Sequence, residues 1–298
     1  MPNLFCNSIN EYTKPRDLQL IEDSIRKTYK KDLFSPFVKA ISDFELLKEN
    51  DKVAVCVSGG KDSLLLAKLF QELKRHNKFN FDLVYICMNP GYTASNEEIL
   101  KQNCEHLNIP IIIKESNVFP IIEKIAAENP CYLCARMRRG FLYSMAKELG
   151  CNKIALAHHF DDVIETTLIN IFYGGQFKTM VPKIKAQNFE DIELIRPLIY
   201  VKEKDIKRYT IKNEIVALNC GCTVAALKTA SKRHEVKELL DNLKITNPNV
   251  ENSIFKSAIN VNIDACLGYI QNGNKYSFND IYINNSKYRT FVKEEKDE

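Results

Sequence analysis

The chain has 298 residues and a net charge of +4, from 42 Lys and Arg against 38 Asp and Glu. Hydrophobic residues make up 45% and charged residues 27%, which is typical of a globular protein and argues against disorder. No apolar run is long enough to span a membrane and residues 1–16 lack the apolar core of a signal peptide, so we expect a cytoplasmic protein without a membrane partner. Ten cysteines in that compartment favour thiols that are buried, reactive or metal-bound.

Residues 1–50 form the first of three parts that we expect, a helical and basic N-terminal extension. Apolar side chains at helical spacing predict helices over residues 18–31 and 36–47, with many Lys residues between them. A basic helix can lie against a nucleic-acid backbone. Most such charge is only a solvated surface, and we prefer the solvated surface as the interpretation here. A central domain over residues 51–215 and a C-terminal extension over residues 216–298 complete the chain.

A buried strand followed by a glycine turn is the most informative stretch. Val alternates with Ala and Cys over residues 52–57, which predicts a strand buried on both faces. Gly59 and Gly60 then let the backbone turn tightly, and Asp62 opens an apolar-periodic run that predicts a helix. Unpaired amide N–H groups and the helix dipole converge at such a turn, so it binds anions, and Lys61 adds a positive charge.

The run from Ser58 to Ser63 reads Ser-Gly-Gly-Lys-Asp-Ser. This spacing fits neither the Walker A loop, in which a longer loop ends in Gly-Lys-Ser/Thr, nor the dinucleotide fingerprint. An ordinary glycine-rich β–α turn is the alternative explanation, which the complete run after a buried strand disfavours. We therefore expect a loop that binds phosphate groups.

Strands and helices alternate after this turn. Further strands are predicted over residues 81–88, 109–114 and 153–157, and helices over residues 95–106, 121–127 and 137–149. This alternation predicts an α/β fold, a Rossmann-like parallel sheet with helices on both faces. Ser95 is the expected N-cap of the helix that it opens, with Glu98 completing a capping box.

Ligands of such sheets bind beyond the carboxyl ends of the strands. Residues 58–63, 87–91 and 158–162 all follow strand ends, so we expect them to line one cleft. Beyond that cleft, a helix over residues 162–172 is expected to end at Gly174-Gly175. Two further helices are predicted over residues 202–212 and 231–243, with a cysteine pair between them and a less periodic part after them.

The segment His158-His159-Phe160-Asp161-Asp162 stands at the mouth of a predicted strand. The carboxylates of Asp161 and Asp162 can hold Mg²⁺ on the phosphates of a nucleotide, which is oxygen-ligand chemistry. His158 or His159 can instead contact phosphate or an activated substrate. The alternative is that both aspartates only cap a helix, and the segment alone does not decide between the two interpretations.

Cys131-Tyr132-Leu133-Cys134 is a Cys-x-x-Cys motif, which can be a redox pair, a zinc half-site or an iron–sulfur half-site. Cys220-Gly221-Cys222 supplies at least one further thiol, although Cys-x-Cys is an unusual spacing for zinc. Three thiolates on a 4Fe-4S cluster would leave one iron open for a substrate or a sulfide. Two unrelated sets of buried cysteines are the alternative explanation.

Arg136, Arg138 and Arg139 follow the Cys-x-x-Cys motif within about a helical turn. There they can bind RNA phosphates or lower the pKa of the cysteine thiols. Lys183, together with the lysines at positions 178 and 185, can extend this basic surface. Solvated charge on a helix is the simpler account of the same residues.

Together these segments resemble the tRNA 2-thiocytidine synthetase family, an iron–sulfur-dependent branch of the PP-loop ATP pyrophosphatase superfamily. The resemblance covers roughly residues 15–270. It rests on Ser58 to Ser63, residues 131–140, His158 to Asp162, Tyr173-Gly174-Gly175, Arg196-Pro197-Leu198, Glu203 to Ile206 and the later cysteine. It implies that the central domain is a PP-loop domain of the adenine nucleotide alpha hydrolase type.

In this family ATP adenylates a cytidine of the tRNA anticodon loop and pyrophosphate is released. A 4Fe-4S cluster held by three cysteines then delivers sulfur to the activated carbon. The resemblance implies that ATP and Mg²⁺ are bound by Ser58, Gly59, Gly60, Lys61, Asp62, Ser63, Met88 and Asp162. It further implies three partners, which are tRNA, a cysteine desulfurase or another sulfur donor, and a second copy of the chain.

The cluster ligands implied by the resemblance are Cys131, Cys134 and Cys222, with Cys220 as the alternative third ligand. Asp62, His158 and Asp161 join these cysteines as expected catalytic residues. Arg136, Arg138, Arg139 and Lys183 are the residues expected to bind RNA. The segment from Cys220 to Lys232 departs from the family's pattern, which leaves the modified base open.

Three other activities fit parts of the same pattern. The first is a PP-loop ligase or amidotransferase without a cluster, similar to lysidine synthetase, which adenylates its substrate and then adds an amine. The second is a non-catalytic iron–sulfur or zinc module that binds RNA. The third is a thiolase in which Cys131 or Cys134 carries sulfur as a persulfide.

Overall fold

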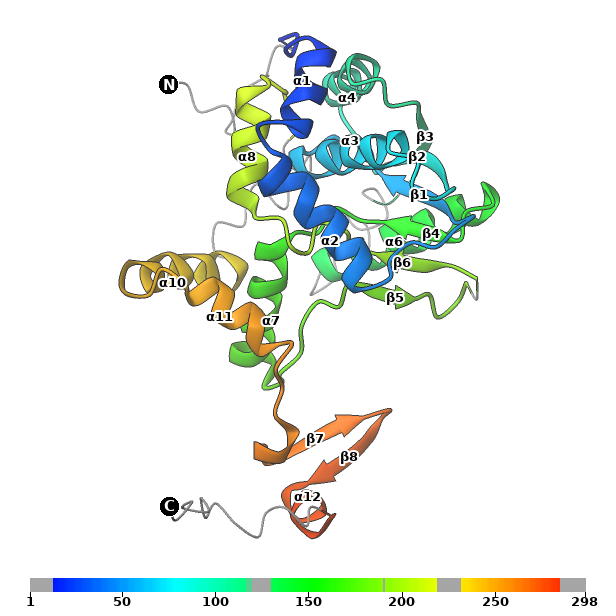
Figure 1. The fold of residues 1–298 in the computed structure, drawn as a ribbon. Coiled ribbons are helices and arrows are strands. Elements are labelled where there is room, and N and C mark those ends of the chain that lie inside the picture. The colour runs from blue at the N-terminus through cyan, green and yellow to red at the C-terminus, as the bar shows by residue number, and fades with distance from the viewer. Residues whose placement is uncertain (1–12, 117, 119–129, 190, 219–231, 285–298) are drawn as a thin grey trace.

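The computed structural model describes residues 13–116, 118, 130–189, 191–218 and 232–284, and a six-stranded sheet lies at its centre (Figure 1). The strands are β1 (Lys52–Cys56), β2 (Asp82–Asn89), β3 (Ile111–Glu115), β4 (Lys153–Ala155), β5 (Lys183–Lys185) and β6 (Glu193–Ile195). Their order is β3-β2-β1-β4-β6-β5, and all neighbouring strands are parallel except β5 and β6. The predicted α/β fold is confirmed.

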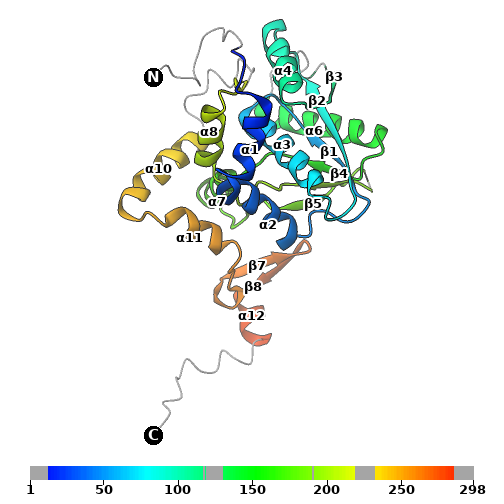
Figure 2. The same cartoon turned by 45° about the horizontal axis from the view of Figure 1, so that its top comes forward.

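Helices connect the strands and cover the sheet. They are α1 (Leu18–Arg26), α2 (Ser35–Asp43), α3 (Lys61–Arg75), α4 (Ala94–His106), α6 (Pro130–Glu148), α7 (Phe160–Gly174), α8 (Glu203–Lys212), α10 (Lys232–Thr246), α11 (Val250–Ser257) and α12 (Phe278–Asn284). A hairpin of β7 (Gly268–Gln271) and β8 (Asn274–Ser277) precedes α12, and Figure 2 shows it extending away from the sheet. Within the described residues, no helix is long and apolar enough to cross a bilayer.

Alternation along β1 gives the sheet two apolar faces. Val53 and Val55 join one core cluster, to which α1, α2, α3 and α8 contribute side chains. Ala54 joins a second cluster with Ile86 of β2 and Met145 of α6 on the opposite face. All three β1 residues are fully buried, so the expectation of a strand buried on both faces is confirmed.

The N-terminal helices differ from their predicted bounds. The predicted helix over residues 18–31 ends at Arg26, and the chain continues as a π-helix over Lys30–Phe34. The Tyr29 amide bonds to the Ser24 carbonyl at 2.8 Å, which is the wide hydrogen-bond step of a π-turn. The predicted helix over residues 36–47 ends early, at Asp43, and Glu45 then adopts a positive φ of 48°.

Two later helices also start elsewhere than predicted. Ser95 is not the N-cap of α4, because the Thr93 hydroxyl accepts the hydrogen bond from the Asn96 amide and Ser95 lies in the first turn. Helix α6 starts at Pro130 rather than at 137, in keeping with the preference of proline for the first helical position. The helix predicted over residues 121–127 lies outside the described residues.

Helices α1 and α2 share a core with the rest of the domain rather than packing by themselves. Phe37 of α2 and Phe70 of α3 are both fully buried, and their rings meet edge to face with centroids 5.2 Å apart. Lys68 of α3 is also buried, and its ammonium bonds to Glu22 of α1 at 2.8 Å. The division of the chain at residues 50 and 215 stays a prediction.

We expect the Phe37 and Phe70 rings to be thermodynamically coupled. Phe37→Leu and Phe70→Leu should each lower the free energy of unfolding by about 1 kcal/mol or more, because each removes half of a buried ring pair. The double variant should lose less than the sum by about 0.5–1.5 kcal/mol, the usual range for aromatic pairs. Urea unfolding of the four proteins measures this. Strict additivity would show that the two rings do not stabilise each other.

Candidate active site

The turn after β1 has a backbone that only glycine permits at one position. Gly59 has a φ of 79°, and a Cβ added there would lie 2.6 Å from the Leu218 side chain. Gly60 is less constrained, since a Cβ would meet no atom closer than 3.6 Å. Gly60 is the N-cap of α3 and brings no side chain to cap the helix, so the first amides of α3 are left to bind a ligand.

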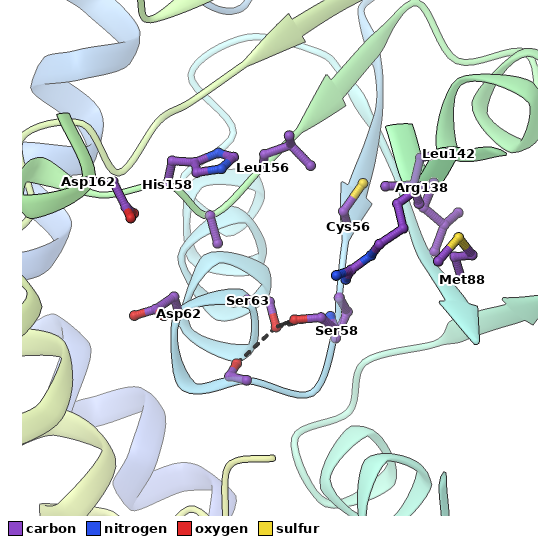
Figure 3. Close-up of a pocket in the computed structure, with 14 residues that line it drawn as sticks. Cys56, Ser58, Asp62, Ser63, Met88, Arg138, Leu142, Leu156, His158 and Asp162 are labelled. Carbon is purple, nitrogen blue, oxygen red and sulfur yellow. Dashed lines mark hydrogen bonds between the residues drawn. The ribbon is translucent and has the colours of Figure 1, made fainter. Parts of the chain in front are cut away.

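Two serine hydroxyls hold this turn. The Ser63 hydroxyl donates to the Gly60 carbonyl at 2.9 Å and accepts from the Ser58 amide at 3.1 Å, and the Ser58 hydroxyl lies 3.2 Å from it. Ser63 is buried, and the hydroxyl oxygens of Ser58 and Ser63 point into the turn (Figure 3). The serines therefore fix the loop's shape before any ligand arrives.

A cavity of about 290 Å³ opens beside this turn, at the carboxyl ends of β1, β2 and β4. One part of its wall is apolar and includes Met88, Leu142 and Leu156, and the other part is polar (Figure 3). The lining residues are Cys56, Val57, Ser58, Gly60, Asp62, Ser63, Ile86, Met88, Arg138, Leu142, Leu156, Ala157, His158 and Asp162. This volume lies near the lower end of the range for small-molecule pockets.

The cavity brings together seven of the residues expected to bind the nucleotide or to act in catalysis: Ser58, Gly60, Asp62, Ser63, Met88, His158 and Asp162. Gly59 and Lys61 belong to the same turn but do not line the cavity. The Lys61 ammonium bonds to Asp62 at 3.0 Å and to Glu203 of α8 at 3.2 Å. Asp162 Oδ2 accepts from the His159 amide at 3.0 Å in a capping box at the start of α7.

Asp161 lies apart from the cavity lining and caps a helix. Its carboxylate accepts the amide of Glu203, the first residue of α8, at 2.7 Å. This contact joins the start of α7 to the start of α8. The capping interpretation of the two aspartates therefore describes Asp161, whereas Asp162 both caps α7 and faces the cavity.

The two histidines are held in different ways. His159 is buried among carboxylates, with ring nitrogens 3.9 Å from Asp62, 3.7 Å from Asp161 and 3.5 Å from Asp162. His158 lines the cavity, and its Nδ1 has no hydrogen-bond partner in the described part of the chain. Burial lowers the pKa of His158 to about 4, so the imidazole is neutral near pH 7.

The predicted RNA-binding residues are distributed over different surfaces. Arg138 of α6 lines the cavity, and Figure 3 shows its side chain extending toward Ser58. Arg136 and Arg139 are exposed on the same helix. Lys183 of β5 is half-buried and donates to the Glu45 carbonyl at 3.3 Å. Arg138 is therefore placed to meet the ligand of the cavity itself.

The cysteines are of two kinds. Burial raises the pKa of the Cys56 thiol, which lines the cavity, far above its ordinary value, and it raises the pKa of Cys87 to about 12. Both are therefore unreactive thiols. Cys131 and Cys134 fall in the first two turns of α6. Cys220 and Cys222 lie outside the described residues.

Sequence reasoning missed a network of charges that connects the turn to α10. Glu203 bonds to Lys61 and, at 3.0 Å, to Lys237 of α10. One turn earlier on α10, Arg233 contacts Asp162 at 3.3 Å and the buried Glu165 at 3.1 Å. Arg233 and Lys237 are four residues apart, which puts them on one helix face, but such charge on a helix is usually solvated.

The electrostatics of this network keep its groups charged. Burial opposes ionisation of Glu203, but hydrogen bonds from Lys207 and Lys237 and the charge of Lys61 outweigh it and hold the pKa of this carboxyl well below its usual range. Burial also opposes the charge of Lys61, and Asp62 and Glu203 outweigh that effect and raise the pKa of Lys61. Lys61 therefore stays protonated while its ammonium is paired with Asp62 and Glu203.

We expect His158 to give the fold a distinct pH dependence. Its pKa is about 4 in the folded chain and 6.5 ordinarily, so between these values only the unfolded chain binds the proton. Stability should therefore fall as the pH falls from about 6.5 to about 4, by on the order of 3 kcal/mol. In His158→Gln this part of the profile should flatten, as measured by urea unfolding at several pH values. An unchanged slope would show that His158 is protonated in the folded chain.

Comparisons with known proteins agree with this geometry. A family model described as a PP-loop domain matches residues 21–217. Proteins named tRNA-cytidine(32) 2-sulfurtransferase match from Citrifermentans bemidjiense (37% identity over 75% of this chain and 88% of that one) and from Geobacter sulfurreducens (35% identity, 80% and 92%). The same-named protein of Paraburkholderia xenovorans is 36% identical, and the match covers 75% of this chain and 66% of its own length.

Solved structures were compared as well, and one of those that share the fold is a tRNA thiolase. It is the U34-tRNA thiolase NcsA from Methanococcus maripaludis with its [4Fe-4S] cluster, with a TM-score of 0.60, 23% identity and coverage of 87% of each chain. The fold, the glycine turn at the carboxyl end of β1 and the extent of these matches lead to one assignment. The chain belongs to the PP-loop family and, within it, to the tRNA 2-thiocytidine synthetases.

Proposed function

We propose that the protein is an ATP-dependent tRNA sulfurtransferase, which adenylates a cytidine of tRNA and replaces its 2-oxygen by sulfur. The relatives named above act on the cytidine at position 32, and we propose the same base here. One observation carries the proposal. The helix that opens with Cys131 and Cys134 also supplies Arg138 to the wall of the cavity beside the glycine turn.

The turn is suited to the phosphates of ATP. The first amides of α3, the φ of Gly59 and the charge of Lys61 form a cradle for pyrophosphate. The apolar wall with Met88, Leu142 and Leu156 accepts a flat ring such as adenine. A cavity with one polar and one apolar part therefore matches a nucleotide better than a free phosphate.

Two carboxylates are available for Mg²⁺. Asp62 Oδ1 is buried without a hydrogen-bond partner among the described residues, and Asp162 faces the same cavity. An unsatisfied carboxylate oxygen costs free energy unless it has a ligand, and Mg²⁺ on nucleotide phosphates prefers such oxygens. Mg²⁺ held there would neutralise phosphate charge during the transfer.

Adenylation follows from this placement. The cytidine 2-oxygen forms a bond to the α-phosphorus of ATP while the bond between that phosphorus and the bridging oxygen of pyrophosphate breaks. The amides of α3 and Lys61 stabilise the charge that collects on the departing pyrophosphate. Arg138 extends from the cavity wall toward Ser58, where its guanidinium can contact the α-phosphate. The neutral His158 can donate or accept a hydrogen bond without adding charge.

The thiolates fit a cluster in their chemistry. Cys131 and Cys134 have iron–sulfur half-site spacing, and Cys222, or alternatively Cys220, would be the third ligand. A 4Fe-4S cluster bound there would supply an open iron for sulfide from a donor, since neither ATP nor RNA contains sulfur. Positions 131, 134, 138 and 142 have the spacing of one helix face, and Arg138 and Leu142 line the cavity. These positions support sulfur delivery close to the adenylated base.

The third cysteine is linked to the same turn through the chain. The Leu218 amide donates to the Gly59 carbonyl at 2.9 Å, so the chain is fixed to the turn at this point. Cys220 is two residues further along and Cys222 four, and each residue adds at most about 3.6 Å. Covalent geometry therefore limits Cys222 to roughly 15 Å from Leu218. This limit supports either cysteine as a ligand.

Three further features of the function are proposals. A sulfur donor such as a cysteine desulfurase is required, because the reaction consumes one sulfur atom per tRNA. A cytoplasmic location follows from the tRNA substrate and from ten cysteines that need a reducing compartment. A homodimer is the expected assembly, and sedimentation would test it.

Cys131→Ala should abolish thiolation and spare ATP binding, because the thiolate is needed for sulfur delivery and not for the phosphate cradle. The measurement is nucleoside mass spectrometry of 2-thiocytidine in a tRNA transcript after anaerobic incubation with ATP and a sulfide source. Nucleotide affinity is measured in parallel by calorimetry.

Cys151→Ala is the matched control, since it removes a buried thiol outside the cavity. It should keep both the iron content and the activity. Wild-type rates of thiolation in Cys131→Ala would contradict the proposed cluster. An iron-free wild-type protein that still thiolates tRNA would favour persulfide transfer.

A further inference from the structure

A second surface lies at the far end of α7. Residues 171–178 are eight consecutive exposed residues, and they include the rings of Phe172, Tyr173 and Phe177. These rings are 52%, 43% and 49% exposed. Single exposed apolar side chains are ordinary, but three neighbouring rings at one helix end form a patch of the kind that marks an interaction site.

The backbone that carries these rings is firmly held. Gly175 ends α7 in the left-handed conformation with a φ of 59°, and its amide and that of Gln176 both bond to the Asn170 carbonyl. The Asn170 side chain donates to the Lys178 carbonyl at 2.8 Å. The rings therefore stand on an ordered turn and not on a frayed helix end, so they are presented in a fixed arrangement.

Lysine side chains accompany the rings, although the Tyr173 hydroxyl also bonds to the Glu235 carboxylate. The Lys232 ammonium lies 4.7 Å from the centre of the Tyr173 ring. Lys178 and Lys185 are exposed, and neither pairs with a carboxylate in the described part of the chain. Protein interfaces are depleted in lysine, whereas aromatic rings among basic side chains are typical of sites for single-stranded nucleic acid. The charge therefore favours RNA over a protein partner.

The distance from the cavity also suits RNA. Helix α7 starts beside Asp162 of the cavity, has 15 residues and is about 22 Å long. Figure 1 shows α7 projecting away from the sheet, with its C-terminal end clear of the sheet's body. Ten residues of this helix, about 15 Å, separate Asp162 from Phe172, and stacked nucleotides rise about 3.4 Å each, so the first ring lies roughly four to five nucleotides from a base held in the cavity.

We propose that Phe172, Tyr173 and Phe177 form a stacking platform for unpaired bases of the RNA substrate, while Lys178 and Lys185 contact its phosphates. The inference rests on the proposed function, in that it takes RNA as the substrate. It assigns to this surface the placement of the target nucleotide, because bases held about 15 Å away fix how the strand enters the cavity. The platform acts in binding and touches no reacting atom.

The test replaces aromatic rings of the platform by leucine, which is similarly apolar, and compares tRNA binding of the variant with that of the wild type. The double variant Phe172→Leu/Phe177→Leu keeps an apolar surface but cannot stack on a base. Tyr282→Leu, which changes an exposed ring on α12, is the matched control. Affinity of the full-length chain for a tRNA transcript is measured by fluorescence anisotropy, and the oligomeric state by sedimentation. We expect the double variant to bind tRNA about 10-fold or more weakly and the control to bind as the wild type does.

The outcomes separate this inference from the proposed function. If the wild type binds no tRNA, the proposed function fails and the platform fails with it. If the wild type binds tRNA and releases pyrophosphate while the double variant binds equally well, the platform alone is overturned. Loss of a dimer in the double variant would overturn it as well, since the rings would then contact a second copy. Weaker tRNA binding with unchanged sedimentation and unchanged ATP affinity supports it.

Discussion

The positive φ of Gly59 is the constraint on which the site depends. It turns the chain sharply at the end of β1, so that α3 starts with amides that face outward from the sheet's edge. Other residue types are strained at this φ, and a Cβ would also lie 2.6 Å from the Leu218 side chain. The dipole of α3, its first amides and Lys61 all lie at the start of α3, and the cavity lies beside this helix end. A larger residue here would displace every group that handles phosphate.

Much of the fold can be predicted from the periodicity of apolar residues. The parts that cannot be predicted in this way are short strands and contacts between distant elements. Strands β1, β2 and β4 are buried on both faces and have continuous apolar runs, which are readily recognised. Strands β5 and β6 have three residues each and include charged residues, without the apolar continuation that β4 has at positions 156 and 157, and they went unpredicted. The C-terminal hairpin was missed because its strands are mostly polar and exposed.

The site was predictable where local sequence determines it. The turn from Ser58 to Ser63 is a continuous segment, and its serines and glycines act within it. Arg138 was assigned to RNA because sequence cannot show which face of α6 meets the sheet. Arg233 was missed for a similar reason, since its carboxylate partners Asp162 and Glu165 are about 70 residues away. Contacts between distant elements require the fold.

The segment over residues 219–231 has both of its flanks attached to the same site. Leu218 bonds to Gly59 on one side, and Arg233 bonds to Asp162 and Glu165 on the other. A chain fixed at both ends tolerates changes of internal length cheaply, since the entropy of closing a loop grows only with the logarithm of its length. The cysteine spacing between these anchors can therefore drift during evolution without moving either anchor.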